Sequence, residues 1–90
     1  MSFKVHLYSS LQNYTGNRNI VEVEGNTVGK CLDSLTGHFP DLKPMLFDPK
    51  GKLLPTIYIS VNLNSPKSEP VSRVLTENDE LYIILIVAGG

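Results

Sequence analysis

The sequence has one cysteine, no tryptophan and no marked excess of charge of either sign. With Cys31 as the single thiol, the chain cannot form an internal disulfide framework or a zinc site made of several cysteines. Its 8 lysine and arginine residues are balanced by 9 aspartate and glutamate residues. A domain that binds nucleic acid ordinarily carries a basic excess for phosphate contacts. We therefore expect no nucleic-acid partner.

A long hydrophobic run is also missing. The longest apolar stretch, residues 81–88, is far shorter than the roughly 20 residues that cross a bilayer, and the first residues lack the basic and apolar regions of a signal peptide. We therefore expect no membrane association and a cytoplasmic location. The 90 residues, 41% of them hydrophobic, predict one folded domain over residues 1–90, which is too short for a large enzyme with its own cofactor domain.

Alternating apolar and polar side chains predict three β-strands, at residues 3–8, 20–24 and 56–62. The first two strands are expected to form a wide hairpin around a polar loop at residues 9–19. Residues 80–87 are apolar at nearly every position, which predicts a central strand that is covered on both faces.

One helix is predicted over residues 27–38. Thr27 is suited to cap its N-terminus, and apolar side chains recur behind it at spacings of three and four, which places them on one face: Val28, Cys31, Leu32, Leu35 and Phe39. Residues 41–47 are expected to add a short helical turn. The run at residues 25–30 resembles a phosphate-binding loop, but its glycines are too close together and Thr27 serves better as a cap.

These elements follow the order of a ubiquitin-like β-grasp, an α+β fold in which one main helix lies across one face of a mixed sheet. We expect four or five strands, the fifth being a short one before the last. The predicted core consists of apolar residues from the helix and the inward face of the strands: Phe3, Val5, Leu7, Val28, Leu32, Leu35, Ile59, Val61, Leu81, Ile83 and Leu85.

No catalytic constellation is predicted. The sequence has no nucleophile elbow, no Cys-x-x-Cys pair and no His-Glu-x-x-His motif. We interpret His6 as a surface residue of a strand, His38 as a residue at a helix C-terminus, where a cation is favourable, and Cys31 as a small core residue. The acidic residues at 77, 79 and 80 are interpreted as solvated side chains in a turn, so no metal site is expected.

The chain ends in Val87-Ala88-Gly89-Gly90, directly after the most apolar strand. Glycine is a poor choice for anchoring a terminus, so we expect a flexible tail. Four extended residues reach about 13 Å, and without Cβ atoms they fit a narrow channel. Such a tail can place its carboxylate in another protein's active site, where it is activated as an acyl-adenylate and converted by sulfide or a persulfide to a thiocarboxylate. The alternative is a frayed end with incidental glycines.

The whole chain resembles the MoaD/ThiS family of ubiquitin-like sulfur carriers. The resemblance rests on residues 3–8, Thr27-Val28, Ile59-x-Val61-Asn62, the segment 78–81 and above all the final Val-Ala-Gly-Gly. It implies a carrier that is not itself an enzyme. Gly90 would be the site of adenylation and thiocarboxylate formation, with Gly89 as its neighbour.

The partners that this resemblance implies are an adenylyltransferase of the ubiquitin-activating type, a sulfur donor enzyme and a sulfur-accepting synthase subunit. ATP would be used by the activating enzyme, and no cofactor would be bound tightly by the carrier. The resemblance is to the small subunit of molybdopterin synthase, which implies a role in molybdenum cofactor biosynthesis.

The sequence departs from the family pattern at three places. Asn78-Asp79 stands where Gly-Asp is frequent, and Leu85-Ile86 stands where molybdopterin synthase subunits often have prolines. The segment 39–54 is longer than in thiamine carriers, and its Asp48-Pro49 and Gly51-Lys52-Leu53 resemble carriers that serve amino-acid biosynthesis. The alternatives are therefore a carrier for cysteine, methionine or thiamine synthesis, a ubiquitin-like protein modifier, or a plain interaction domain.

A partner-binding surface is predicted on the face of the sheet away from the helix. Alternation sends five large apolar side chains there, which is more than scattered surface residues, and tyrosine is typical of interface anchors. The predicted partner-binding residues are these five and the two that follow them: Tyr8, Tyr58, Tyr82, Ile84, Ile86, Val87 and Ala88.

Overall fold

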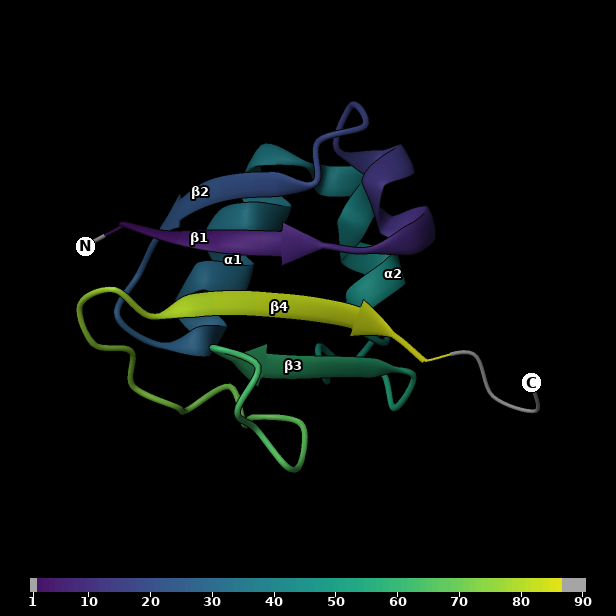
Figure 1. Ribbon diagram of the computed structural model, residues 1–90. Helices are drawn as coiled ribbons and strands as arrows, with labels where there is room; N and C mark the ends of the chain where they lie inside the picture. Colours follow the sequence, from purple (N-terminus) through teal and green to yellow (C-terminus); the bar gives the residue numbers. More distant parts are fainter. Residues whose placement is uncertain (1, 87–90) are drawn as a thin grey trace.

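The computed structural model describes residues 2–86 and shows a mixed four-stranded sheet (Figure 1). The strands are β1 (Ser2–Leu7), β2 (Ile20–Glu24), β3 (Ile57–Val61) and β4 (Glu80–Leu85), in the spatial order β2-β1-β4-β3. β1 is parallel to β4, whereas β1 with β2 and β3 with β4 are antiparallel. The predicted hairpin and the central position of the last strand are confirmed.

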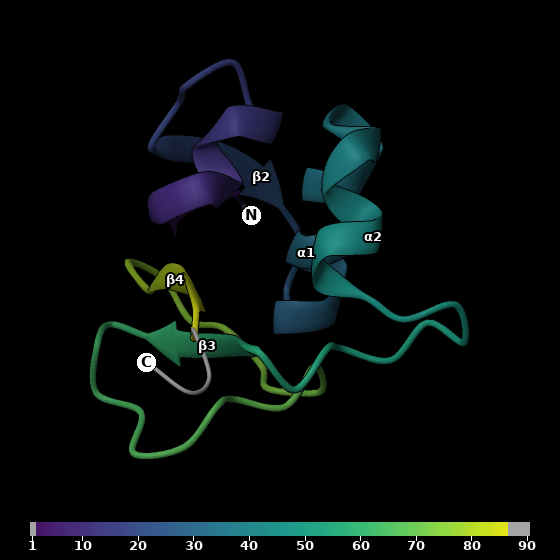
Figure 2. The same ribbon diagram turned by 90° about the vertical axis from the view of Figure 1, so that its right-hand side faces the viewer.

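One layer of helices covers one face of this sheet (Figure 2). It contains α1 (Val28–His38), the 3-10 turn η2 (Pro40–Leu42) and α2 (Lys43–Leu46). The hydroxyl of Thr27 accepts a hydrogen bond of 3.1 Å from the Lys30 N–H, which confirms the predicted cap. The helical turn expected within residues 41–47 is also present. No helix within residues 2–86 is long and apolar enough to cross a membrane.

The core lies between the sheet and α1, as predicted. Each predicted core residue is buried except Leu85, which is half-buried and packs against the core. Several buried residues were missing from the predicted core. Val21, Val23 and Ile57 alternate correctly within predicted strands but were not included, whereas the others lie outside the main helix and the strands: Leu11, Leu42, Leu46 and Leu75. The short helices therefore close the ends of the core that α1 alone does not reach.

The prediction of a loop over residues 9–19 was wrong for its first half, where η1 (Ser9–Tyr14) forms a 3-10 helix. Leu11 is fully buried, and the side-chain amide of Gln12 donates a 2.8 Å hydrogen bond to the Leu7 carbonyl. A single buried leucine among polar residues has no periodicity, so the pattern gave no helical signal. Gly16 and Asn17, both with positive φ, then turn the chain into β2.

The connection from β3 to β4 contains no fifth strand among the described residues; it makes one isolated bridge, between Val74 and Thr27. Instead, it caps the outer edge of β3. The Ser68 hydroxyl accepts a hydrogen bond from the Ile59 N–H at 3.0 Å, and the Ser65 hydroxyl accepts one from the Val61 N–H at 3.1 Å. Side chains thus satisfy backbone groups that another strand would otherwise pair with.

Candidate functional site

The path of β4 leads to the predicted reactive end of the chain. β4 ends at Leu85, and the Ile86 N–H donates a 2.7 Å hydrogen bond to the Thr56 carbonyl. The backbone is therefore held to the β3 side of the sheet up to residue 86. The four predicted site residues that follow, Val87, Ala88, Gly89 and Gly90, lie outside the described residues.

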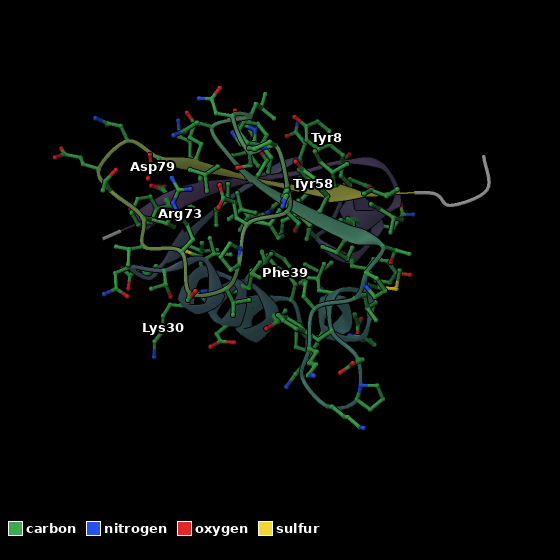
Figure 3. All side chains as sticks on the ribbon, turned by 90° about the horizontal axis from the view of Figure 1, so that it is seen from below. Tyr8, Lys30, Phe39, Tyr58, Arg73 and Asp79 are labelled. Carbon is green, nitrogen blue, oxygen red and sulfur yellow. The ribbon has the colours of Figure 1, made fainter. Side chains whose placement is uncertain are left out.

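The sheet face turned away from α1, called the open face below, carries the remaining predicted partner-binding residues. Tyr58 lies opposite Ile84 in the β3–β4 register, and His6 lies opposite Tyr82 in the β1–β4 register. Tyr8 follows β1 and lies on the other side of the sheet from Lys30 of α1 (Figure 3). The structure therefore brings together side chains from three strands, as alternation predicted.

The open face is less exposed than the sequence suggested. Tyr8 and Ile86 are 40% and 46% exposed, whereas Tyr58, Tyr82 and Ile84 are half-buried among their neighbours. The expectation that a layer covers both faces of the last strand was wrong, since α1, η2 and α2 pack against one face only (Figure 2). On its second face, the apolar side chains of β4 pack among the other side chains of the open face, and no second layer of helices covers them in the part of the chain that the structure describes.

Stacked aromatic rings occupy the centre of the open face. The rings of His6 and Tyr82 are stacked with centroids 4.2 Å apart. The rings of Tyr8 and Tyr82 are also stacked, with centroids 6.3 Å apart. Desolvation raises the pKa of the Tyr82 phenol, and the negative charge of Glu80 raises it further. Both effects act in the direction that keeps the phenol uncharged. The Tyr58 hydroxyl donates a hydrogen bond to the Ser65 carbonyl, which holds that ring in place.

The open face is polar at one end and apolar at the other. At the start of β4, Glu80 Oε1 lies 2.5 Å from His6 Nε2, and Lys4 lies opposite Glu80 in the register. Toward the end of β4 the face presents Ile84 and then Ile86. The apolar end is the one from which the chain continues to Gly90. Sequence reasoning placed His6 at the surface but missed its pairing with Glu80, because 74 positions separate the two residues.

The turn before β4 uses the carboxylate of Asp79. It accepts hydrogen bonds from the Thr76 N–H at 2.8 Å and from the Asn62 side-chain amide at 2.8 Å. The Thr76 N–H, more than any other group, lowers the pKa of Asp79. Asp79 therefore serves the turn and Glu80 pairs with His6, so these two carboxylates do not converge on a common point.

The other candidate reactive side chains lie apart from one another. Cys31 is fully buried on the inner side of α1, where desolvation raises the pKa of its thiol. His38 lies at the C-terminus of α1 and is exposed, whereas His6 belongs to the open face. The structure thus confirms the interpretation of Cys31 as a core residue. It brings none of these three residues into reach of another.

A mixed sheet with this strand order and one main helix across it defines a ubiquitin-like β-grasp protein. A model of the ThiS family matches residues 5–90, and the chain therefore belongs to the ThiS family. The family consists of small ubiquitin-like sulfur carriers and modifiers. The match includes the C-terminal glycine pair.

Solved structures agree with this assignment. SAMP1 from Haloferax volcanii is 28% identical, with 100% of both chains covered and a TM-score of 0.86. The small archaeal modifier protein 1 from Methanosarcina acetivorans is 30% identical, with 99% of this chain and 96% of that chain covered and a TM-score of 0.82.

A chain in the Amycolatopsis orientalis BexX/CysO complex is 27% identical, with 98% of this chain and 99% of that chain covered and a TM-score of 0.81. No curated protein matches the sequence.

Proposed function

We propose that this protein is a sulfur carrier that acts through the carboxylate of Gly90. The observation that carries the proposal is the ThiS family match, which extends to residue 90 and so includes the terminal Gly89-Gly90 pair. A partner of the ubiquitin-activating type would adenylate the carboxylate with ATP and release pyrophosphate. A sulfide or persulfide sulfur from a donor enzyme would then attack the acyl carbon and expel AMP; with a persulfide, a thiol must also cleave the S–S bond to leave the thiocarboxylate.

In this proposal the carrier contributes position and the partner contributes catalysis. Cys31, the only thiol of the sequence, is buried, so we propose that the attacking sulfur comes from a partner. The nucleotide is a substrate of the activating enzyme, and we propose no tightly bound cofactor for the carrier. The protein therefore acts as a co-substrate.

The open face is the proposed docking surface for these partners. Its anchors are Tyr8, Tyr58, Tyr82, Ile84 and Ile86, and the proposed contact continues through Val87 and Ala88 toward the reactive end. Stacking and the Tyr58 hydrogen bond restrict several of these side chains before binding, which lowers the entropy lost on association. The likeness to a chain of the BexX/CysO complex supports a protein partner for this domain.

The sulfur acceptor is proposed to be a synthase subunit. Molybdenum cofactor synthesis is one pathway for it, and cysteine, methionine and thiamine synthesis are the others. A second function, conjugation of Gly90 to lysine side chains of target proteins, is favoured by the 30% identity to the small archaeal modifier protein 1 of Methanosarcina acetivorans. Both functions begin with the same activated carboxylate.

The first prediction is that Gly90 becomes a thiocarboxylate. The carrier is incubated with its activating enzyme, ATP and a sulfur donor, and intact-mass measurement should show the exchange of one oxygen for one sulfur. The product should then react with iodoacetamide in the native state. Because Cys31 is buried and its thiol pKa is raised, it should react only after denaturant is added.

A chain that ends at Ala88 and the variant Cys31→Ala are the matched controls. The truncated chain should gain no sulfur, whereas Cys31→Ala should gain it and be alkylated once in the native state. Isopeptide-linked adducts on lysine, without any thiocarboxylate, would favour the modifier function. An unchanged mass, with no lysine adducts, after incubation with an activating enzyme that adenylates another carrier of the family would refute both functions.

A further inference from the structure

The two edges of the sheet are treated differently. The edge of β3 is capped by the following segment, in which Ser65 and Ser68 accept its N–H groups and the Glu69 N–H donates to the Ile59 carbonyl at 2.8 Å. β2 forms the opposite edge (Figure 1). An edge strand with free backbone groups is a template for pairing with another extended chain.

The pairing of β1 with β2 identifies which backbone N–H and C=O groups of β2 point away from the sheet. The Leu7 N–H donates to the Asn19 carbonyl at 2.8 Å, so the odd-numbered residues of β2 pair with β1, because the ladder alternates. The backbone groups of the even-numbered residues Ile20, Glu22 and Glu24 therefore face away from the sheet. Among the described residues, the structure records one contact for them, a long 3.4 Å hydrogen bond from the Glu24 N–H to the Ser34 hydroxyl.

Side chains beside this edge favour a particular ligand. Glu22 and Glu24 are exposed, and within residues 2–86 neither has an ion pair. Glu22 stands opposite Lys4 in the β1–β2 register, and its carboxylate accepts a 3.3 Å hydrogen bond from the Ser2 hydroxyl. Ile20 is 45% exposed on the same face of β2. On the α1 side, a hollow bordered by Glu24, Ser34 and His38 leaves room next to the strand.

Charge also argues against a second copy of this chain as the occupant. Antiparallel pairing of two β2 strands about Glu22 would set Glu22 directly opposite Glu22 of the second copy, and such a pair of like charges destabilises a sheet. An added strand with lysine or arginine at alternate positions would instead place its cations opposite Glu22 and Glu24. Its remaining side chains would lie on the α1 side, next to Ser34 and His38.

We propose that the β2 edge binds an extended basic segment of a partner protein as an additional strand of the sheet. The outward N–H and C=O groups of Ile20 and Glu22 supply the hydrogen bonds, and the two glutamates select the charge. This site is independent of the proposed sulfur chemistry. β1 separates β2 from β4, so the edge and the open face near Ile84 are able to hold different partners at once.

The probe is a synthetic peptide, acetylated and amidated, of alternating lysine and valine. Titration into the full-length protein at low salt should shift the amide NMR signals of Ile20 and Glu22 and protect them from hydrogen exchange. N-methylation of the peptide residues that face β2 should abolish this effect, whereas N-methylation of the alternate residues should preserve it. A glutamate–valine peptide of the same length should not bind.

Paired variants test the role of charge. Glu22→Gln combined with Glu24→Gln should weaken binding about three- to tenfold, the size of two exposed cross-strand ion pairs. Asp33→Asn combined with Asp41→Asn changes the net charge equally at exposed positions away from β2 and should leave binding unchanged. Binding that is insensitive to N-methylation, shifts centred outside β2, or dimerisation of the free protein through β2 would overturn the proposal.

Discussion

Gly25 joins β2 to α1 with a backbone conformation that other residues rarely adopt. Its φ is +153°, and a Cβ atom placed there would lie 2.8 Å from the Cys31 backbone nitrogen. Because that nitrogen belongs to the first turns of α1, moving it aside would disturb the hydrogen bonds of the helix. The glycine is therefore required by the close approach of strand and helix, which fixes where α1 lies on the sheet.

Two glycine substitutions should have opposite effects on stability. Gly25→Ala should lower the free energy of unfolding by more than about 1 kcal/mol, because it combines a strained φ with a steric conflict. Gly37→Ala should raise it by about 0.5 kcal/mol, since Gly37 lies in α1 with open space at its Cβ position and alanine favours the helix.

Urea denaturation of the two variants and of the natural chain measures these differences in the free energy of unfolding. An alanine at position 25 that leaves the unfolding midpoint unchanged would contradict the close contact between β2 and α1.

The end of β3 is tied to the start of β4 by hydrogen bonds of the Asn62 side chain. The Asn62 side-chain oxygen accepts from the Glu80 N–H at 2.8 Å, while its amide nitrogen donates to Asp79. Asn62 and Asn78 both have positive φ, a conformation that asparagine tolerates well. These contacts fix the start of β4 against the end of β3, in the register that pairs Val61 with Leu81.

The stabilising effect of Asp79 should depend on pH. Its folded-state pKa is lowered, chiefly by the Thr76 N–H, so its contribution is fully present above the unfolded-state pKa of about 4. The contribution is lost as the pH falls through the lower folded-state value. Solvent screening keeps the effect small.

The free energy of unfolding should be measured between about pH 6 and about pH 2. It should fall with pH in the natural chain and fall less in Asp79→Asn. The amide in this variant still accepts from Thr76 but does not titrate. Asp79→Ala should lose about 1 kcal/mol at neutral pH, the net value of a protein hydrogen bond. Parallel pH profiles for the natural chain and Asp79→Asn would contradict this account.

The whole molecule separates its structural face from its proposed binding surfaces. The helices cover one face of the sheet, the open face carries the aromatic cluster, and β2 forms an edge away from both β4 and β3 (Figures 1 and 2). The hydrophobic core therefore depends little on the side chains of the open face. Changes on that face are expected to alter binding more than folding.

Ile84→Asp should weaken binding to the activating enzyme or the sulfur acceptor by about 1–3 kcal/mol, as for a moderate interface hot spot. The fold should be retained, because Ile84 is half-buried and lies outside the main core. Val74→Asp is the matched control: Val74 is 62% exposed and bridges to Thr27 at the start of α1. Calorimetric titration of each variant measures the difference. A folded Ile84→Asp protein that is activated and discharged at the natural rate would place the docking surface elsewhere.

Local sequence patterns were sufficient to predict most elements of the fold. Alternation identified the strands that bury Val5 and Ile59, and Thr27 marked the start of the helix, because these signals depend on residues that are neighbours in the chain. The terminal Gly89-Gly90 pair directed the functional hypothesis for the same reason. Leu11 escaped prediction because its burial depends on elements from distant parts of the chain.

Tertiary structure decided the features that arise from pairing between distant segments. The parallel alignment of β1 with β4 brings His6 to Glu80 and stacks it on Tyr82, and no spacing in the sequence encodes that register. The capped edge of β3 and the open edge of β2 likewise follow from strand order and from the path of the β3–β4 connection. Local propensity determines which residues form a strand, whereas burial and hydrogen bonding across the whole molecule determine which strands become its edges.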